Sequence, residues 1–287
     1  MKWIGRRESS NVDDRRSMSG GKVAAGGGVI GVLIYLVYTF MSGGQVDPSQ
    51  VQRQIAGQGE APTQMTAEEQ QEDEKRASFV KVVLADTEEV WDKLFRQQGQ
   101  TYQHPVLVLF RGQVESACGY ASAASGPFYC PGDNQLYIDL SFYEDLQHKL
   151  NAPGDFPMAY VVAHEVGHHI QNLNGTAAKV NRLRQELSER EFNKYSVMME
   201  LQADFLAGVW AHHAEQMYAS LEAGDIQEAL NAASAIGDDR LQQQSGGRVV
   251  PDAFTHGTSA QRMYWFKKGY ETGDMRQGDT FNAPDLR

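Results

Sequence analysis

The sequence His164-Glu165-Val166-Gly167-His168 lies inside an apolar stretch that begins at Pro157 and ends at Asn174. Proline suits the first turn of a helix and Gly175 suits the position after its last turn, so a helix is predicted over residues 157–174. Histidines four residues apart on a helix project from the same side and can bind one metal ion. The glutamate between them can accept a proton from a water held by that ion. This pattern predicts a zinc site with Glu165 as general base; the alternative is a chance match.

A catalytic zinc site keeps three protein ligands and one open position, so a third ligand is needed. The metzincin pattern is excluded, because it requires glycine and histidine where this chain has Gln171 and Asn174. Glu200 and Asp204 are four residues apart in a second apolar stretch and share one helix face. We predict that Glu200 is the third ligand and that Asp204 accepts the free ring N–H of a ligand histidine. The alternative is a solvated acidic face, which the apolar neighbours disfavour because a lone buried carboxylate is costly.

Composition narrows the classes of protein that this chain can represent. The chain has 287 residues, a formal net charge of −11 at pH 7 and 41% hydrophobic residues. A mean hydropathy of −0.49 excludes a polytopic membrane protein, since several apolar spans would raise it. The acidic balance lacks the basic surface that binding to a phosphate backbone requires, so nucleic acid is not an expected partner. Two cysteines are too few for a disulfide framework or a cysteine-based zinc site.

The N-terminal region has the charge pattern of a membrane anchor. Residues 1–22 carry six basic and three acidic side chains, and residues 23–41 are uncharged. At about 1.5 Å per helical residue, this uncharged stretch roughly matches the hydrocarbon core of a bilayer. We expect a basic cytoplasmic segment over 1–22, a single transmembrane anchor over 23–41, and the rest of the chain outside. A cleaved signal peptide and a buried soluble helix are the alternatives.

Two regions of different composition follow the predicted anchor. Residues 42–76 are rich in Gln, Gly, Glu, Pro and Ser, and such a stretch is typical of a flexible linker. Residues 77–287 are long enough to bury one sizeable core, so we expect a single domain there. The predicted strands are 105–110 and 136–140, and the predicted helices are 79–97, 157–174, 177–192, 196–223, 226–244 and 258–270. A few strands followed by many helices predicts an α+β fold.

The histidine and glutamate motifs together resemble those of a gluzincin metallopeptidase. Ser116-Ala117-Cys118-Gly119, Gly126-Pro127-Phe128-Tyr129-Cys130-Pro131 and Tyr137-Ile138-Asp139-Leu140 resemble segments of the bacterial neutral zinc metallopeptidase family. The resemblance covers nearly the whole chain, linker included. It implies a zincin-like fold, one Zn²⁺ per chain and a protein or peptide substrate. It also implies a single-span membrane protein whose catalytic domain is extracytoplasmic, in the periplasm.

The same resemblance suggests a strand that binds the substrate. In zincins an edge strand above the active-site helix pairs with the extended substrate, and this role would fall to Leu136, Tyr137, Ile138, Asp139 and Leu140. Pairing through main-chain hydrogen bonds gives affinity with little sequence selectivity. The alternative is that these residues form an ordinary strand of the sheet.

A basic residue that stabilises the oxyanion is a further expectation from the resemblance. Related gluzincins place a histidine or an arginine near the metal, which here points to His256 or Arg262 as a catalytic residue. The alternatives are a loop hydrogen bond for the histidine and a surface salt bridge for the arginine.

The two cysteines, Cys118 and Cys130, are twelve residues apart around a Gly-Pro turn. If the domain lies outside the cytoplasm, we expect them to form a disulfide, worth about 3 kcal/mol in the chain-entropy model. Metal ligation by the cysteines is the minor alternative, because the histidines and Glu200 already complete a catalytic set.

We interpret the chain as a membrane-anchored zinc metalloendopeptidase that hydrolyses peptide bonds of envelope proteins. The alternative is a catalytically weak or inactive zincin-like protein that binds or scaffolds envelope proteins. The presence of Glu165 disfavours that alternative, since a scaffold needs no general base. A structural zinc domain is a weaker alternative, because no fourth protein ligand is found. The sequence leaves the oligomeric state open.

Overall fold

The computed structural model describes residues 1–17, 65–246 and 249–286. The chain forms two compact units, one of Met1–Asp14 with Lys75–Arg287 and the other of Arg15–Glu74. The anchor predicted over 23–41 lies outside the described residues. Among the helices of the described ranges, none is both long and apolar enough to span a bilayer.

A four-stranded sheet lies at the centre of the larger unit. Its strands are β1 (Val12–Asp14), β2 (Val106–Phe110), β6 (Gln135–Asp139) and β5 (Phe128–Cys130), in that spatial order. β1 and β6 both run parallel to β2, whereas β5 is antiparallel to β6. Strands β3 (Gln113–Ser116) and β4 (Gly119–Ser122) form a separate antiparallel hairpin.

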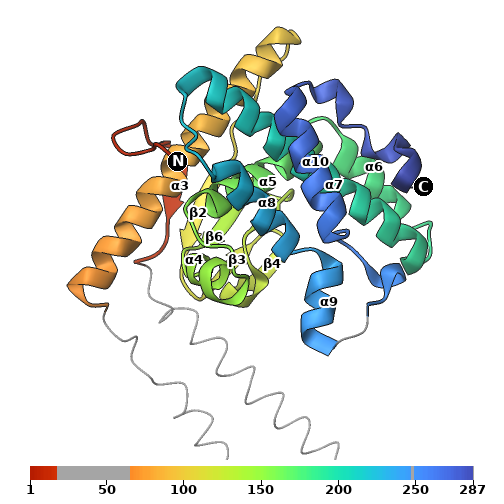
Figure 1. Ribbon diagram of the computed structural model, residues 1–287, viewed down its shortest axis with the longest axis horizontal. Helices are drawn as coiled ribbons and strands as arrows, with labels where there is room; N and C mark the ends of the chain where they lie inside the picture. Colours follow the sequence, from red (N-terminus) through yellow and green to blue (C-terminus); the bar gives the residue numbers. More distant parts are fainter. Residues whose placement is uncertain (18–64, 247–248, 287) are drawn as a thin grey trace, which may run out of the picture. The chain divides into compact units, whose positions relative to one another are not determined.

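Helices surround this sheet (Figure 1), so the predicted α+β class is confirmed. Within the described ranges, the helices of eight or more residues are α3 (Ala67–Gln97), α5 (Phe156–Leu173), α6 (Thr176–Leu183), α7 (Glu189–Tyr218), α8 (Asp225–Ala235), α9 (Asp238–Gly246) and α10 (Ser259–Thr272). A short α4 (Phe142–Glu144) follows β6. Leu107 and Leu109 of β2 belong to the main helical core, while Val108 and Phe110 pack in a smaller cluster that includes Val114 of the hairpin. Both faces of β2 are therefore buried, which explains its unbroken apolar sequence.

Several predicted helix boundaries differ from the structure. The charged helix predicted over 177–192 is two helices, α6 and the start of α7, because Ser188 caps α7 with its side chain. The helix predicted over 226–244 is divided into α8 and α9 at Gly237. α3 begins at Ala67, so the end of the predicted linker 42–76 is helical.

The N-terminal residues are the largest departure from the predicted organisation. Residues 1–14, which we call the N-terminal arm, belong to the same compact unit as the helical domain. Within the arm, Val12 of β1 pairs with Leu107 of β2 as part of the central sheet. The sequence gives little sign of this, since Val12-Asp13-Asp14 is too short and polar to indicate a strand.

α7 and α10 pack closely against each other (Figure 1). Gly269 of α10 lies directly against α7, and a Cβ atom built there would be 2.0 Å from the carbonyl oxygen of Phe205. Glycine is thus required for this approach of the two helices, since no side chain fits between the backbones.

Substitution of this glycine tests the helix contact. We expect Gly269→Ala to lower the free energy of unfolding by about 3 kcal/mol or more, because α10 must move away from α7. Urea unfolding of the full chain measures the change. Lys267→Ala, at an exposed position of the same helix, is the control and should cost under about 0.5 kcal/mol. Equal effects of the two substitutions would contradict the close contact.

Candidate metal centre

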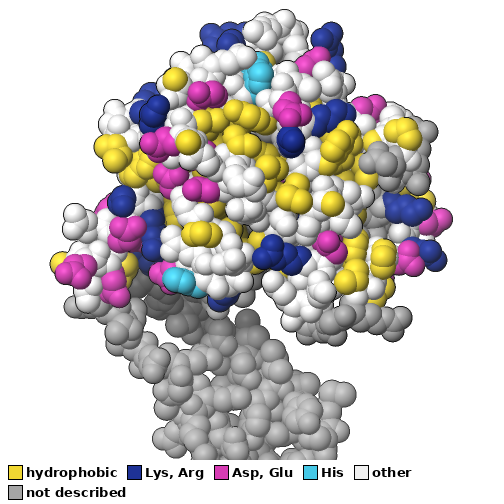
Figure 2. Space-filling model, in the orientation of Figure 1, with side chains coloured by type: hydrophobic (Ala, Val, Ile, Leu, Met, Phe, Trp, Pro, Cys, Tyr) yellow, Lys and Arg dark blue, Asp and Glu magenta, His cyan; other side chains and the backbone are white. Residues whose placement is uncertain are grey.

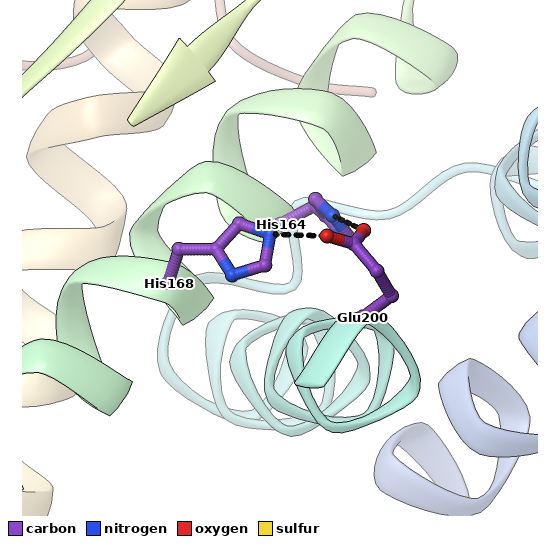
Figure 3. Close-up of side chains that lie close together, drawn as sticks. All are labelled: His164, His168 and Glu200. Atoms are coloured by element: carbon purple, nitrogen blue, oxygen red, sulfur yellow. Dashed lines mark hydrogen bonds and ion pairs between the residues drawn. The ribbon is translucent and has the colours of Figure 1, made fainter. Parts of the chain in front are cut away.

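Three side chains from two helices converge on one point in the domain. His164 and His168 extend from α5 toward Glu200 of α7 (Figure 3). The Nε2 atom of His164 lies 3.2 Å from Glu200 Oε2, and Nε2 of His168 lies 3.4 Å from Glu200 Oε1. One ligand atom from each of the three residues lies within 4.8 Å of the others. The structure thus brings the three predicted ligands together.

These distances fit a zinc ion. Ligand atoms about 2.0–2.1 Å from a tetrahedral ion are separated from one another by roughly 3.4 Å. The nitrogen-to-oxygen distances of the site are close to this value. Two imidazoles with one carboxylate are also a donor set that catalytic zinc sites use. The residues present can therefore hold zinc and leave a coordination position open.

Each ligand histidine has a partner that orients its ring. The Nδ1–H of His164 donates to Asp204 Oδ1 at 2.9 Å, as the sequence predicts for this aspartate. The Nδ1–H of His168 donates to the side-chain oxygen of Gln171 at 2.9 Å. Gln171 is fully buried, and its amide nitrogen donates to the carbonyl oxygen of Met199, which fixes its orientation. Both rings therefore direct Nε2 at Glu200, in the tautomer that metal binding requires.

Asp204 is fully buried and needs further partners to remain charged. Arg262 of α10 supplies them, with Nε 2.8 Å from Asp204 Oδ2 and Nη2 3.0 Å from Oδ1. The hydroxyl of Tyr160 also donates to Asp204, and it accepts a hydrogen bond from Arg262. The remaining Nη1 contacts the carbonyl oxygen of Ile236 at 3.4 Å. Most of the guanidinium thus binds Asp204 and its surroundings, while Arg262 also lines the cleft beside the ligands, and the oxyanion role stays a prediction for this residue.

The charges of the metal-free site are strongly coupled. Burial opposes protonation of His164, but the charge and hydrogen bond of Asp204, with Glu200, outweigh it and raise the pKa of His164 to about 10. Glu200 likewise raises the pKa of His168 against the effect of burial. Burial would raise the pKa of Glu200, but the two histidines hold it well below its usual range. The raised pKa makes His164 an imidazolium at pH 7, paired with the carboxylates of Asp204 and Glu200.

Gly167 sets the distance between the two ligand helices. A Cβ atom built on Gly167 would be 3.0 Å from both the Cα atom and the carbonyl oxygen of Ala203 in α7. Because these are backbone atoms, a larger residue would push α7 away from α5. This approach brings Glu200 and Asp204 within reach of the histidines.

Glu165, the predicted general base, is buried beside the ligand set. Burial raises the pKa of its carboxyl group, and the nearby His168 and His164 partly counter the rise. Its carboxylate also accepts a hydrogen bond from the backbone N–H of Tyr129 in β5. The base is thus held by the strand that lies next to the metal centre.

This strand is not the one that the resemblance suggests. β6, which contains Leu136 and Ile138, is hydrogen-bonded to β2 on one side and to β5 on the other, so it has no free edge. The prediction of 136–140 as the substrate edge strand is therefore wrong. β5 is the edge strand beside α5, and its three residues between Pro127 and Pro131 were too short to be recognised from sequence.

The side chain of Tyr129 fixes β5 to the active-site helix. Its hydroxyl lies 3.0 Å from His169 Nδ1 and also contacts Asn172 and Asn134 at 3.0 and 2.9 Å. His169 is 1% exposed, and its Nε2–H donates to the carbonyl oxygen of Gln103 at 2.6 Å. The signal for His169 in the sequence is its position next to His168. These contacts hold the edge strand in place above α5.

The ligand set opens into a cleft of about 870 Å³. Its lining includes Phe128 and Tyr129 of β5, Val180 of α6 and Phe192 of α7. His256 also lines the cleft, and its Nδ1 lies 3.2 Å from Asp238 Oδ1, which raises the pKa of His256 through this hydrogen bond. On the molecular face of Figure 2, acidic and basic side chains of the described residues are interspersed.

A disulfide links the β3–β4 hairpin to the edge strand. Cys118, at the turn of the β3–β4 hairpin, is bonded to Cys130 at the end of β5, as predicted. Because the bond joins the hairpin to the edge strand, it restricts the positions that β5 can adopt.

A second group of potential ligands is made only of carboxylates. Asp155, Asp225 and Glu228 offer oxygen atoms within 4.8 Å of one another. The amino group of Met1 lies between the first two, 3.0 Å from Asp155 and 3.3 Å from Asp225. This group is therefore explained by an ion pair, and its oxygens are harder donors than zinc prefers.

The chain is similar to known proteins along almost its entire length. The family described as "Putative neutral zinc metallopeptidase" matches residues 1–281, and the chain belongs to this family. It is 50% identical over 290 residues to "Uncharacterized protein YpfJ" of Escherichia coli K12, which covers 98% of this chain and 99% of the relative. It is 42% identical over 218 residues to "Uncharacterized protein Rv2575" of Mycobacterium tuberculosis H37Rv, covering 72% and 73% of the two chains. No solved structure matches the chain.

Substitution of Arg262 tests how Asp204 is held. We expect Arg262→Met to weaken zinc binding about 10–100-fold and to lower the free energy of unfolding by about 3–5 kcal/mol, because Asp204 loses its buried cation. Arg262→Lys retains the charge but not the paired hydrogen bonds. Its zinc affinity and free energy of unfolding should therefore lie between those of Arg262→Met and the unsubstituted protein. Competition with a chromophoric chelator measures the affinity, and Lys267→Met is the exposed control. Zinc affinity unchanged in Arg262→Met would contradict the positioning role.

Zinc binding should release protons. The raised pKa of His164 keeps the metal-free ring protonated at pH 7, whereas a zinc ligand must be neutral. The affinity should therefore fall as pH falls, about tenfold per unit between pH 8 and 6. Calorimetry in phosphate and in Tris gives the number of protons released, which we expect to be about one per zinc or more. Asp204→Asn should release fewer protons when it binds zinc. A binding enthalpy that is the same in both buffers for the unsubstituted protein would contradict a protonated His164 in the metal-free site.

Proposed function

We propose that the protein is a zinc-dependent metalloendopeptidase that hydrolyses peptide bonds in proteins of the cell envelope. One observation carries the proposal: His164, His168 and Glu200 surround a point that Glu165 also borders, inside a cleft. Membership of the zinc metallopeptidase family supports the same activity. The zincin-like character of the fold is part of the proposal and is supported by the two-helix arrangement of the ligands.

Zinc bound to this site would act as a Lewis acid, polarising the substrate carbonyl and lowering the pKa of a water molecule. Glu165 accepts the proton of the attacking water and then transfers it to the nitrogen of the leaving amine. Its raised pKa suits both steps, because a carboxylate with an ordinary pKa would donate the proton poorly. The backbone N–H of Tyr129 keeps the carboxylate oriented between transfers.

His256 is the better candidate for stabilising the oxyanion. It lines the cleft, and its Nδ1–H donates to Asp238, so Nε2 can donate a hydrogen bond when the ring is protonated, the form that the raised pKa of His256 favours. Asp238 also accepts from the backbone N–H groups of His256 and Gly257, so the loop that carries the histidine is fixed. A preorganised donor of this kind stabilises the charge that develops on the carbonyl oxygen.

The edge strand β5 supports an extended peptide as substrate. Its partner β6 occupies only one side, and no other strand of the described residues pairs with β5. An extended chain laid along this side would bind through its main chain, which favours cleavage within a polypeptide. The Cys118–Cys130 disulfide supports an oxidising compartment such as the periplasm, where envelope proteins would be the substrates.

Substitution of the general base tests the proposal. We expect Glu165→Gln to reduce kcat at least about 10³-fold on casein or a mixed fluorogenic peptide library while one zinc per chain is retained. Glu186→Gln, at an exposed position, is the matched control and should retain full activity. Glu200→Ala should lose zinc and activity together.

The outcomes separate catalysis from metal binding. Hydrolysis that persists in Glu165→Gln would contradict the mechanism. Zinc binding without hydrolysis of any library peptide by the unsubstituted protein would favour a zincin-like binding protein instead.

A further inference from the structure

The N-terminal arm is built into the domain through its backbone. The N–H of Leu107 in β2 donates to the carbonyl oxygen of Asn11 at 2.9 Å, and the N–H of Ser9 donates to the carbonyl oxygen of Lys81 in α3 at 3.0 Å. β1 then continues the sheet in parallel register with β2. Parallel strands are usually buried elements of a domain and are seldom formed by loose tails.

Buried charges on α3 depend on the arm. Arg6 binds Asp86 through two hydrogen bonds of 2.8 and 2.7 Å, and Asp86 is 4% exposed. Glu88 is 2% exposed and accepts hydrogen bonds from Ser9 and Asn11 of the arm. Breaking a buried ion pair is strongly unfavourable, so these contacts oppose separation of the arm from α3.

Apolar and aromatic contacts add to this attachment. The ring of Trp3 meets Phe79 of α3 edge to face, with centroids 5.4 Å apart. The guanidinium of Arg6 lies 4.1 Å from the ring centroid of Tyr218 at the end of α7. The arm therefore contacts the sheet and both long helices, and its removal would expose all three.

This attachment constrains how the chain can cross a membrane. The arm and residues 75–97 of α3 lie on either side of the chain between them, and both belong to one compact unit. A chain whose two flanks are held in one domain can cross a bilayer only an even number of times.

We propose that residues 1–14 and the metal-binding domain lie on the same side of the membrane. This differs from the arrangement expected from the charge pattern, in which the N-terminus is cytoplasmic and the domain is outside. The structural reason is that the positive charges of Arg6 and Arg7 neutralise α3 carboxylates, so these charges need not mark a cytoplasmic tail. The inference does not depend on peptidase activity.

Cysteine labelling of the full chain in intact cells tests the shared side. Ile4→Cys and Tyr264→Cys place thiols on the arm and on α10, at positions that are 84% and 55% exposed. Each variant is treated with a membrane-impermeant maleimide before and after lysis. The unsubstituted chain, whose two cysteines form a disulfide, measures the background labelling. The proposal predicts the same result for both sites, either labelling of both in intact cells or labelling of both only after lysis. Labelling of one site alone in intact cells would overturn it.

A charge reversal tests whether the arm is docked in the membrane-bound chain. Arg6→Glu should lower the unfolding temperature of the full chain in membranes by about 5 °C or more, and adding Asp86→Arg should recover much of the loss. Arg190→Glu, which breaks an exposed ion pair with Asp252, is the matched control and should shift it by about 1–2 °C at most. An equally small shift for Arg6→Glu would overturn the docked arm.

Discussion

Asp204 lies at the point where three helices meet. The hydrogen bonds that its buried carboxylate requires determine the geometry of the site. It is fully buried, with His164 of α5 and Arg262 of α10 as its charged partners. A buried carboxylate without such partners would be strongly unfavourable, so the three helices must keep their relative positions. The glycines at the helix contacts, Gly167 and Gly269, allow the approach that these hydrogen bonds require.

In this arrangement, the residues that orient the metal ligands differ from the residue proposed as the general base. Asp204 and Gln171 orient the two histidine rings, while Glu165 faces the cleft and is held by the backbone of Tyr129. The edge strand β5 is fixed in turn by His169 and by the disulfide, so Glu165 and β5 share one set of supports. A rigid base beside a fixed strand is what positioning for general-base catalysis requires.

Sequence patterns predicted the parts of the site that are local to a helix. Spacing of four residues gave His164 with His168 and Glu200 with Asp204, and apolar surroundings indicated that both pairs are buried. Arg262 and Tyr129 could not be assigned this way, because their roles depend on which helix packs on α7 and which strand ends the sheet. The N-terminal arm was missed for a related reason: its arginines look like a cytoplasmic flank until the α3 carboxylates are seen beside them.

X-ray absorption at the zinc edge of the zinc-loaded full chain tests the central claim most directly. The account predicts two imidazole nitrogens and oxygen donors, from Glu200 and one solvent ligand, at about 2.0–2.2 Å. A sulfur shell at about 2.3 Å, or a shell of oxygens without imidazole, would contradict the site formed by His164 and His168. An oxygen-only shell would place the metal instead among carboxylates such as Asp155 and Asp225.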